Sequence, residues 1–269
     1  MKIGIIQMDI ELGNPKVNFN KVLVTTNKIM QLKEKLDVIV LPELWTTGYS
    51  LNNIKNMLSE EGKESANFLG KLSEKYGVWF IGGSVMASTP TGIVNRAQVI
   101  NPKGELINTY DKIHLFGLMD EDKYFINGEK INLFNLDGIT SSCVICYDIR
   151  FCELIRTIAL SGTKLLFVSA EWPHPRLNHW RTLLIARAIE NQMYVVACNR
   201  VGKSGGNTFF GHSMIIDPWG EIVDELTEER EDVLIVDIDL SLVDEVRNKI
   251  PVFKDRRPET YNLLNNKEK

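Results

Sequence analysis

Residues 142–156 read SCVICYDIRFCELIR, and this segment points to an α/β architecture. Its first five residues are small or apolar in succession, which is typical of a strand that is covered on both faces. From Phe151 onward the pattern changes to that of a helix. A strand that is buried on both sides and leads into a helix is a basic unit of α/β proteins.

Similar apolar runs recur along the whole chain and predict further strands. They lie at residues 3–8, 38–41, 78–85, 97–100, 106–110, 165–169, 194–198, 213–216 and 233–238. Apolar residues at helical spacing predict three further helices. The residues are Phe19, Val22, Leu23, Thr26, Ile29, Met30 and Leu36 in the first, Phe68, Leu69 and Leu72 in the second, and Trp180, Leu183, Leu184, Ala186 and Ala188 in the third. Turn residues at 102–104 and 217–220 predict two hairpins.

This order of elements predicts two sheets with helices on their outer faces. We find no internal repeat and no linker that would separate two domains, so we expect a single domain over residues 1–269. The segment from about Lys254 to Lys269 is strongly polar. We expect residues 254–269 to be either a disordered tail or an arm that packs on a partner subunit.

The composition excludes several classes of function. The 269 residues are 44% hydrophobic and 25% charged, as in ordinary globular proteins, and the formal net charge is −4. This charge gives no basic footprint for nucleic acid, and no stretch approaches the roughly 20 apolar residues that cross a membrane. Residues 1–7 resemble a strand and have too short an apolar core for a signal peptide. We therefore expect a cytoplasmic protein with reduced cysteines.

Two of the four cysteines imitate a metal or redox motif. Cys143 and Cys146 form a C-x2-C, and His174 and His179 form an H-x4-H, but the gap between the pairs is longer than zinc-finger spacing. Residues three apart on a strand face opposite sides, so the two thiols cannot close a disulfide without distortion. We expect no metal. We expect the other cysteines to be small buried residues: Cys143, Cys152 and Cys198.

Cys146 differs because it lies where the strand ends and a helix is about to begin. The N–H groups and dipole of a helix start would favour a thiolate there. Two more apolar runs end in a reactive side chain, since Glu43 follows residues 38–41 and Lys112 follows residues 106–110. Strand ends can converge on one crevice. Taken singly, the cysteine would be a buried structural thiol, and the other two would be surface residues.

Together these three groups suit the hydrolysis of an amide. A carboxylate beside the sulfur can take the thiol proton and later give one to the departing ammonia. Glu43 follows Pro42 at a strand end, so we expect it to be partly desolvated and better able to carry that proton. Lys112 and the backbone N–H of Tyr147 would stabilise the oxygen that becomes negative.

The sequence resembles the nitrilase superfamily of carbon–nitrogen hydrolases, whose catalytic residues are Glu, Lys and Cys in this chain order. The matching segments are residues 41–43 (LPE), 110–116 (YDKIHLF) and 146–151 (CYDIRF), and the similarity extends from residue 7 to about residue 261. The resemblance implies a four-layer αββα sandwich that pairs into a homodimer. It also implies a second glutamate after the lysine, for which Glu121, between Asp120 and Asp122, is the expected match.

Within the superfamily the chain is most similar to the omega-amidases, through residues 187–192 (RAIENQ), 211–220 (GHSMIIDPWG) and 250–254 (IPVFK). The resemblance implies a small amide substrate, 2-oxoglutaramate or 2-oxosuccinamate. A cysteine thioester would form with release of ammonia, and water activated by Glu43 and placed by Glu121 would hydrolyse it. No metal or organic cofactor is required.

The carboxylate of such a substrate needs a cation in the pocket. We expect Arg150 to supply it, because it lies four residues after Cys146. Aromatic residues often form pocket walls, and three are expected here: Tyr49, Phe116 and Trp172. The alternative is that Arg150 caps a helix and that the aromatic residues belong to the core.

Other functions stay open at this point. The nearest are other amidases of the superfamily, such as those acting on deaminated glutathione or on carbamoyl compounds, followed by a true nitrilase. A catalytically silent dimeric scaffold is a further alternative. The intact Glu43, Lys112 and Cys146 argue against it, because an unused reactive thiol is exposed to oxidation.

Overall fold

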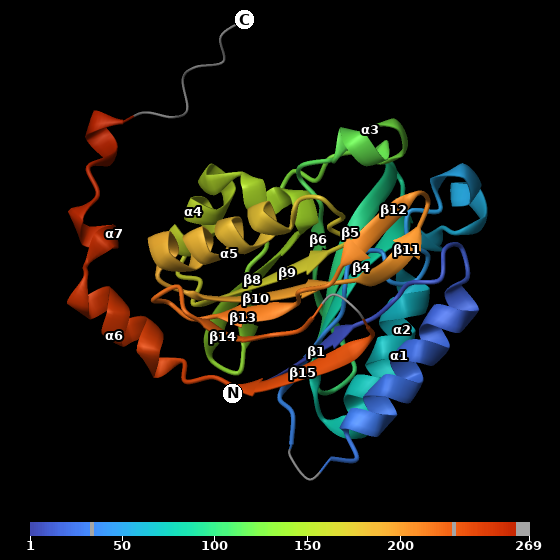
Figure 1. Ribbon diagram of the computed structural model, residues 1–269, viewed down its shortest axis with the longest axis horizontal. Helices are drawn as coiled ribbons and strands as arrows, with labels where there is room; N and C mark the ends of the chain where they lie inside the picture. The colour runs from blue at the N-terminus through green and yellow to red at the C-terminus, as the bar shows by residue number, and fades with distance from the viewer. Residues whose placement is uncertain (33–34, 228–229, 262–269) are drawn as a thin grey trace, which may run out of the picture.

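Two β-sheets face each other across the centre of the protein, and helices cover their outer faces (Figure 1). The computed structural model describes residues 1–32, 35–227 and 230–261. The first sheet contains β1 (Lys2–Gln7), β2 (Val38–Val40), β3 (Ser59–Glu60), β4 (Trp79–Thr89), β5 (Gly92–Ile100), β6 (Leu106–Asp111) and β15 (Asp232–Asp237). The second contains β7 (Phe134–Leu136), β8 (Ile139–Ile145), β9 (Leu165–Ala170), β10 (Tyr194–Asn199), β13 (Met214–Ile216) and β14 (Ile222–Glu225). A separate hairpin consists of β11 (Val201–Ser204) and β12 (Asn207–Phe210).

The strand order brings ends from both sheets to one region. The first sheet runs β15-β1-β2-β4-β5-β6, with β3 beside β4, and the second runs β14-β13-β10-β9-β8-β7. Strands β1, β2 and β4 are parallel to one another, and so are β8, β9 and β10. The hydroxyl of Ser169 in β9 donates to the carbonyl of Leu41 just after β2, at 2.9 Å. The carboxyl ends of β2 and β9 therefore meet between the sheets.

Helices form the two outer layers. In Figure 1, α1 (Pro15–Ile29) and α2 (Lys63–Tyr76) lie against the first sheet, and α4 (Cys152–Leu160) and α5 (Leu177–Asn191) lie against the second. Asn14 caps α1, because its side-chain oxygen accepts from the Val17 N–H at 3.3 Å. The shorter helical elements are α3 (Glu121–Tyr124), α6 (Ser241–Lys249), α7 (Val252–Asp255), η1 (Leu51–Asn56), η2 (Gly117–Met119), η3 (Cys146–Arg150) and η4 (Pro258–Thr260). The expected four-layer αββα sandwich is confirmed.

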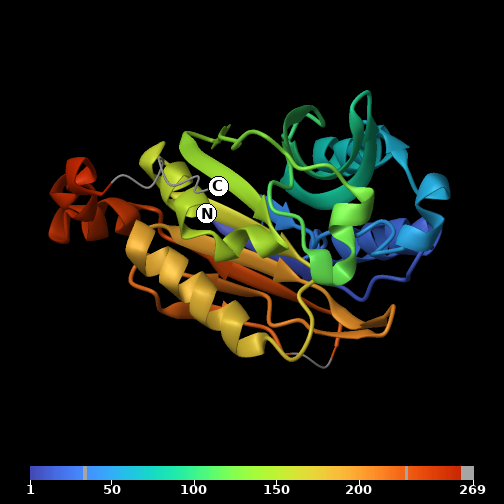
Figure 2. The ribbon, with the colours of Figure 1, turned by 90° about the horizontal axis from the view of Figure 1, so that it is seen from above.

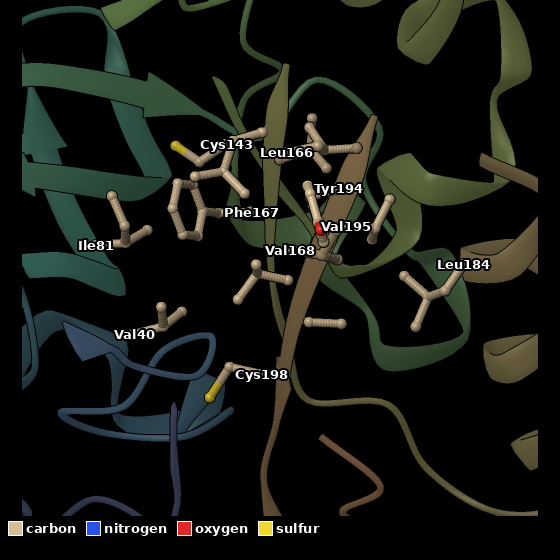
Figure 3. Close-up of a cluster of buried hydrophobic side chains, with 14 of the residues drawn as sticks. Val40, Ile81, Cys143, Leu166, Phe167, Val168, Leu184, Tyr194, Val195 and Cys198 are labelled. Carbon is tan, nitrogen blue, oxygen red and sulfur yellow. The ribbon is translucent and has the colours of Figure 1, made fainter. Parts of the chain in front are cut away.

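Apolar side chains fill the space between the layers. Val40 and Ile81 of the first sheet point toward Phe167 of the second (Figure 3). The preceding residue along β9, Leu166, points to the opposite side, toward Leu184 of α5 (Figure 3). Successive strand residues face different layers, so a strand in the middle of the sandwich is apolar at consecutive positions. Each such side chain stabilises the fold by about 1.5–3 kcal/mol when fully buried.

Most of the predicted elements are confirmed, including the two hairpins, but two expectations are wrong. Helix α1 ends at Ile29, so Leu36, which the helical spacing assigned to it, lies outside the helix and packs in the core. The strand at 142–146 ends at Ile145, and Cys146 begins the 3₁₀ turn η3 instead of leading directly into an α-helix. Helix α4 starts only at Cys152.

The last described elements form an arm. Helices α6 and α7 project from one end of the sandwich (Figure 2). The segment expected to be a tail or an arm is helical at the end of α7 and in η4, and residues 262–269 lie outside the described residues.

In the part of the chain that the structure describes, no helix is both long enough and apolar enough to cross a membrane. The single domain, the homodimer and the cytoplasmic location stay predictions.

Candidate active site

Three strand ends bring a carboxylate, an ammonium and a thiol together. Glu43 follows β2, Lys112 follows β6 and Cys146 follows β8. The Nζ of Lys112 lies 2.7 Å from Oε1 of Glu43 and 2.7 Å from Oε2 of Glu121. The buried Cys146 thiol lies close enough to Glu43, Lys112 and Glu121 for their charges to shift its pKa. Glu43, Lys112 and Glu121 are completely buried, so all four predicted residues lie in one buried cluster.

Glu43 is held through both of its carboxylate oxygens. Oε1 accepts hydrogen bonds from Tyr49 Oη at 2.8 Å, Asn95 Nδ2 at 2.9 Å and Lys112 Nζ. Oε2 accepts from the backbone N–H of Glu171 at 2.9 Å. The burial of Glu43 is thus more complete than the partial desolvation that the sequence predicts. Hydrogen bonds from several directions hold the carboxylate in one orientation beside the thiol.

The backbone of β4 shapes the turn that carries Glu43. Gly83 has a φ of +60°, and a Cβ at this position would lie 2.0 Å from the carbonyl oxygen of Pro42. Leu44 also has a positive φ, 41°, and its N–H donates to Ser84 Oγ at 2.9 Å. Only glycine allows the segments around Gly83 and Pro42 to approach so closely. Gly83 therefore determines the position of Glu43.

We expect Gly83→Ala to reduce activity and stability together, because the new methyl group must displace Pro42 and with it Glu43. Gly77→Ala is the matched control, since Gly77 has a similar φ of +64° but a Cβ at that position would meet nothing within 4 Å. Both variants carry the strain of a left-handed backbone, about 1 kcal/mol. Urea unfolding should show Gly83→Ala to be less stable than the control by about 2 kcal/mol or more. Equal losses in both variants would contradict this account.

Glu121 is the member of its acidic trio that points into the site. It is the first residue of α3, and the preceding Asp120 has a left-handed φ of 60° that turns the chain inward. Oε1 accepts from Tyr49 and Asn95, and Oε2 accepts from Lys112 and from the backbone N–H of Phe116 at 2.6 Å. Burial raises the pKa of Glu121, Lys112 lowers it, and Glu43 raises it further. The net effect is a raised pKa.

Asp148, which the sequence analysis missed, joins two of the motifs. Its buried carboxylate accepts from the Tyr110 hydroxyl at 2.8 Å and from the backbone N–H of Ile145 at 3.0 Å. It also accepts from the backbone N–H of His114 at 3.0 Å. Asp148 therefore ties the segment around Lys112 to the turn around Cys146. The only sequence feature that could have indicated this role is the position of the aspartate, two residues after the cysteine at the strand end.

Cys146 occupies a strained backbone position at the strand end. Its φ is 46°, in the left-handed region that residues with a side chain rarely adopt. Burial raises the pKa of the thiol well above its ordinary value, Glu43 raises it further, and Lys112 lowers it by less. This shift is opposite to the one that the sequence predicts from a helix start, and Cys146 begins a 3₁₀ turn and not an α-helix. Burial and the neighbouring Glu43 carboxylate favour the protonated form of the thiol.

A small pocket lies beside the thiol. It is lined by Phe116, Cys146, Tyr147, Arg150, Glu171, Trp172, Pro173 and Arg176. The Arg150 guanidinium lies 4.6 Å from the centre of the Trp172 ring, and that of Arg176 lies 5.8 Å from the centre of the Phe116 ring. Tyr49, which we expected in the pocket wall, instead directs its hydroxyl at the two buried glutamates.

Two arginines, Arg150 and Arg176, line the pocket, and the sequence analysis predicted only Arg150. Arg150 contacts His179 Nδ1 at 3.3 Å, and among residues 1–32, 35–227 and 230–261 neither Arg150 nor Arg176 forms an ion pair with an acid. Burial lowers the pKa of Arg150, and the nearby Arg176 lowers it further. Arg176 was missed because it lies far from the quoted motifs, in the loop before α5.

The other cysteines are free thiols outside the cluster. Cys143 is buried and accepts from Asn132 Nδ2 at 3.0 Å, and Cys198 is buried and donates to the Ile6 carbonyl at 3.3 Å. Cys152 is exposed, so the expectation that it is buried is wrong. It is the first residue of α4, where the chain turns outward after η3.

The chain belongs to the carbon-nitrogen hydrolase family, whose sequence profile matches residues 2–248. It is thus an enzyme of this class. The 2-oxoglutaramate amidase of Bacillus subtilis (strain 168) is 46% identical to it over 259 residues, which cover 96% of this chain and 98% of that protein.

Solved structures of the same superfamily share the fold. A CN-hydrolase superfamily protein from Xanthomonas campestris, with an arsenic adduct in its active site, is 29% identical and has a TM-score of 0.88, with 96% of this chain and 97% of that chain covered. Nit3 from Saccharomyces cerevisiae, a member of branch 10 of the nitrilase superfamily, is 26% identical with a TM-score of 0.88, and 96% of each chain is covered. The resemblance to the nitrilase superfamily is therefore confirmed.

Proposed function

We propose that this enzyme hydrolyses the terminal amide of a small 2-oxo acid, such as 2-oxoglutaramate or 2-oxosuccinamate, and releases ammonia. One observation carries this proposal. The guanidinium groups of Arg150 and Arg176, which pair with no acid in the described part of the chain, line the same pocket as the buried thiol of Cys146. The amidase of Bacillus subtilis is a relative whose name specifies such a substrate, which supports the same choice.

In the first half of the proposed cycle, Glu43 takes the proton of the Cys146 thiol as the sulfur attacks the amide carbon. Lys112 Nζ and the backbone N–H of Tyr147 stabilise the oxygen that becomes negative. Glu43 then gives the proton to the amide nitrogen, the carbon–nitrogen bond breaks, and ammonia leaves. The product of this half is a thioester between Cys146 and the acyl group.

In the second half, Glu43 takes a proton from water, and the resulting hydroxide attacks the thioester carbon. The carbon–sulfur bond breaks, and the Cys146 sulfur recovers a proton from Glu43. Glu121 contacts four protein groups, including Lys112 and the Phe116 N–H. We therefore assign Glu121 to holding the Lys112 ammonium in place, and not to placing the water as the sequence suggested.

The two arginines also account for selectivity within amides. The substrate carboxylate can pair with one guanidinium, and the 2-oxo oxygen can accept from the other. Glutamine and asparagine carry an α-ammonium where these substrates carry the oxo group. The two guanidinium groups that line the pocket repel that ammonium, so amino acid amides should be poor substrates.

We expect Arg150→Gln and Arg176→Gln each to raise KM for 2-oxoglutaramate by about 10- to 100-fold, with a smaller effect on kcat. The assay measures ammonia release from 2-oxoglutaramate, glutamine and a carbamoyl amine. The matched control is Arg181→Gln, because Arg181 pairs with Glu225 and neither residue lines the pocket. The proposal fails if the wild type leaves 2-oxo acid amides intact, and rapid hydrolysis of the carbamoyl amine would favour a carbamoyl amidohydrolase.

A further inference from the structure

A buried carboxylate that the proposed cycle does not use lies beside the thiol. Glu171 directly follows β9 and is completely buried. Its Oε2 accepts from Arg200 Nη1 at 2.9 Å. Its Oε1 is also buried, and within the described ranges no group donates a hydrogen bond to it. A buried carboxylate oxygen without a donor is costly, so this oxygen needs a partner that the chain itself does not supply.

Glu171 is placed to meet a substrate. It lines the pocket that contains Cys146 and both arginines, and its backbone N–H donates to Glu43 Oε2. Burial raises the pKa of Glu171 to about 7, even though Arg200 lowers it, and Glu43 also raises it. Because Arg200 Nη1 donates to Oε2 and no group of the described residues donates to Oε1, a donor from the substrate would find Oε1 available.

We propose that Oε1 of Glu171 accepts a hydrogen bond from the nitrogen of the substrate's primary amide and so selects an –NH2 leaving group over an alkoxy group. The inference rests on the proposed function, because it requires the amide to lie between Cys146 and Glu43. In that position the nitrogen must be near Glu43, which protonates it, and Glu171 is the neighbouring acceptor. A primary amide has two N–H donors, and each needs an acceptor once the amide leaves bulk water.

The test is Glu171→Gln, assayed with 2-oxoglutaramate and with the analogue in which a methyl ester replaces the terminal amide. Arg200 donates to position Oε2, so the new glutamine side chain must turn its oxygen there, and its NH2 group then replaces Oε1. Two donors would face each other when the amide binds. We expect kcat/KM for the amide to fall by about 10- to 100-fold, while kcat/KM for the ester, which has no N–H, changes by less than about 3-fold.

The ratio of kcat/KM for the amide to kcat/KM for the ester does not depend on the amount of folded enzyme, because both substrates are assayed with the same preparation. Asp9→Asn is the matched control. Asp9 accepts from Arg200 Nη2 at 2.7 Å and is not among the residues that line the pocket, so this change should leave the ratio unaltered. If Glu171→Gln does not fold, Glu171→Asp is assayed in its place. It keeps the charge but withdraws the oxygen from the amide, so it should also lower the ratio of the amide kcat/KM to the ester kcat/KM.

Two results would overturn the inference alone: an unchanged amide rate in Glu171→Gln, or equal falls for amide and ester, which indicate a structural role through Arg200. A wild type that is inactive on the amide would overturn the proposed function itself, and the inference with it.

Discussion

Cys146→Ala is expected to abolish ammonia release, with a loss of about 10,000-fold or more, while the fold is retained. Cys146 is the nucleophile of the proposed cycle, and no thioester can form without its sulfur. The substitution removes one buried atom from a turn that Asp148 holds independently through Ile145. Circular dichroism and urea unfolding should therefore be close to those of the wild type.

Cys152→Ala is the matched control, because Cys152 is an exposed thiol six residues further along the chain. It should keep full activity. Mass spectrometry after brief exposure to substrate should show the acyl adduct on the wild type and on Cys152→Ala, and none on Cys146→Ala. Substantial ammonia release by Cys146→Ala would end the thioester mechanism.

Lys112→Met is expected to reduce both activity and stability. Lys112 is the only cation in contact with Glu43 and Glu121 among the described residues. Burial lowers the pKa of Lys112, but Glu121 and Glu43 raise it more, so the ammonium stays charged throughout the neutral range. Removing it leaves two buried carboxylates facing each other, at a cost of about 3–5 kcal/mol. Loss of the oxyanion partner should lower kcat by about 1,000-fold.

A second substitution separates these two effects. In Lys112→Met with Glu121→Gln, the like-charge repulsion disappears, so urea unfolding should recover much of the lost stability. Activity should stay low, because the oxygen of the tetrahedral intermediate still lacks its cation. If the double variant regained activity, Lys112 would act only by neutralising the glutamates. If the single variant were as stable as the wild type, the buried cluster would not carry the charges assigned here.

The residues of the proposed catalytic set could be selected from the sequence because strand ends can be recognised from the local pattern. Glu43, Lys112 and Cys146 each follow an apolar run, and the three motifs occur in the order of the superfamily. Glu121 could also be selected, since it lies at the expected distance after Lys112. Arg150 was found through the chemistry of the substrate and its position after Cys146, and it does line the pocket.

The supporting residues could not be predicted in the same way. Asn95 donates to both glutamates from the middle of β5, and Glu171 reaches the site from the end of β9. Nothing in their local sequence distinguishes them from other polar residues near strands. Arg176 is similar, because its loop meets the pocket only after β9 and α5 have packed.

The sequence by itself determined the elements, their order, the two-sheet architecture and the three reactive side chains, because periodicity and strand-end position are local properties. Only the tertiary structure decided which groups surround the thiol and in which direction they shift its pKa. That shift depends on burial and on charges contributed by residues such as Glu43 and Lys112, which lie far from Cys146 in the chain. Distances between such residues are set by how the sheets pack, and a linear pattern does not contain them.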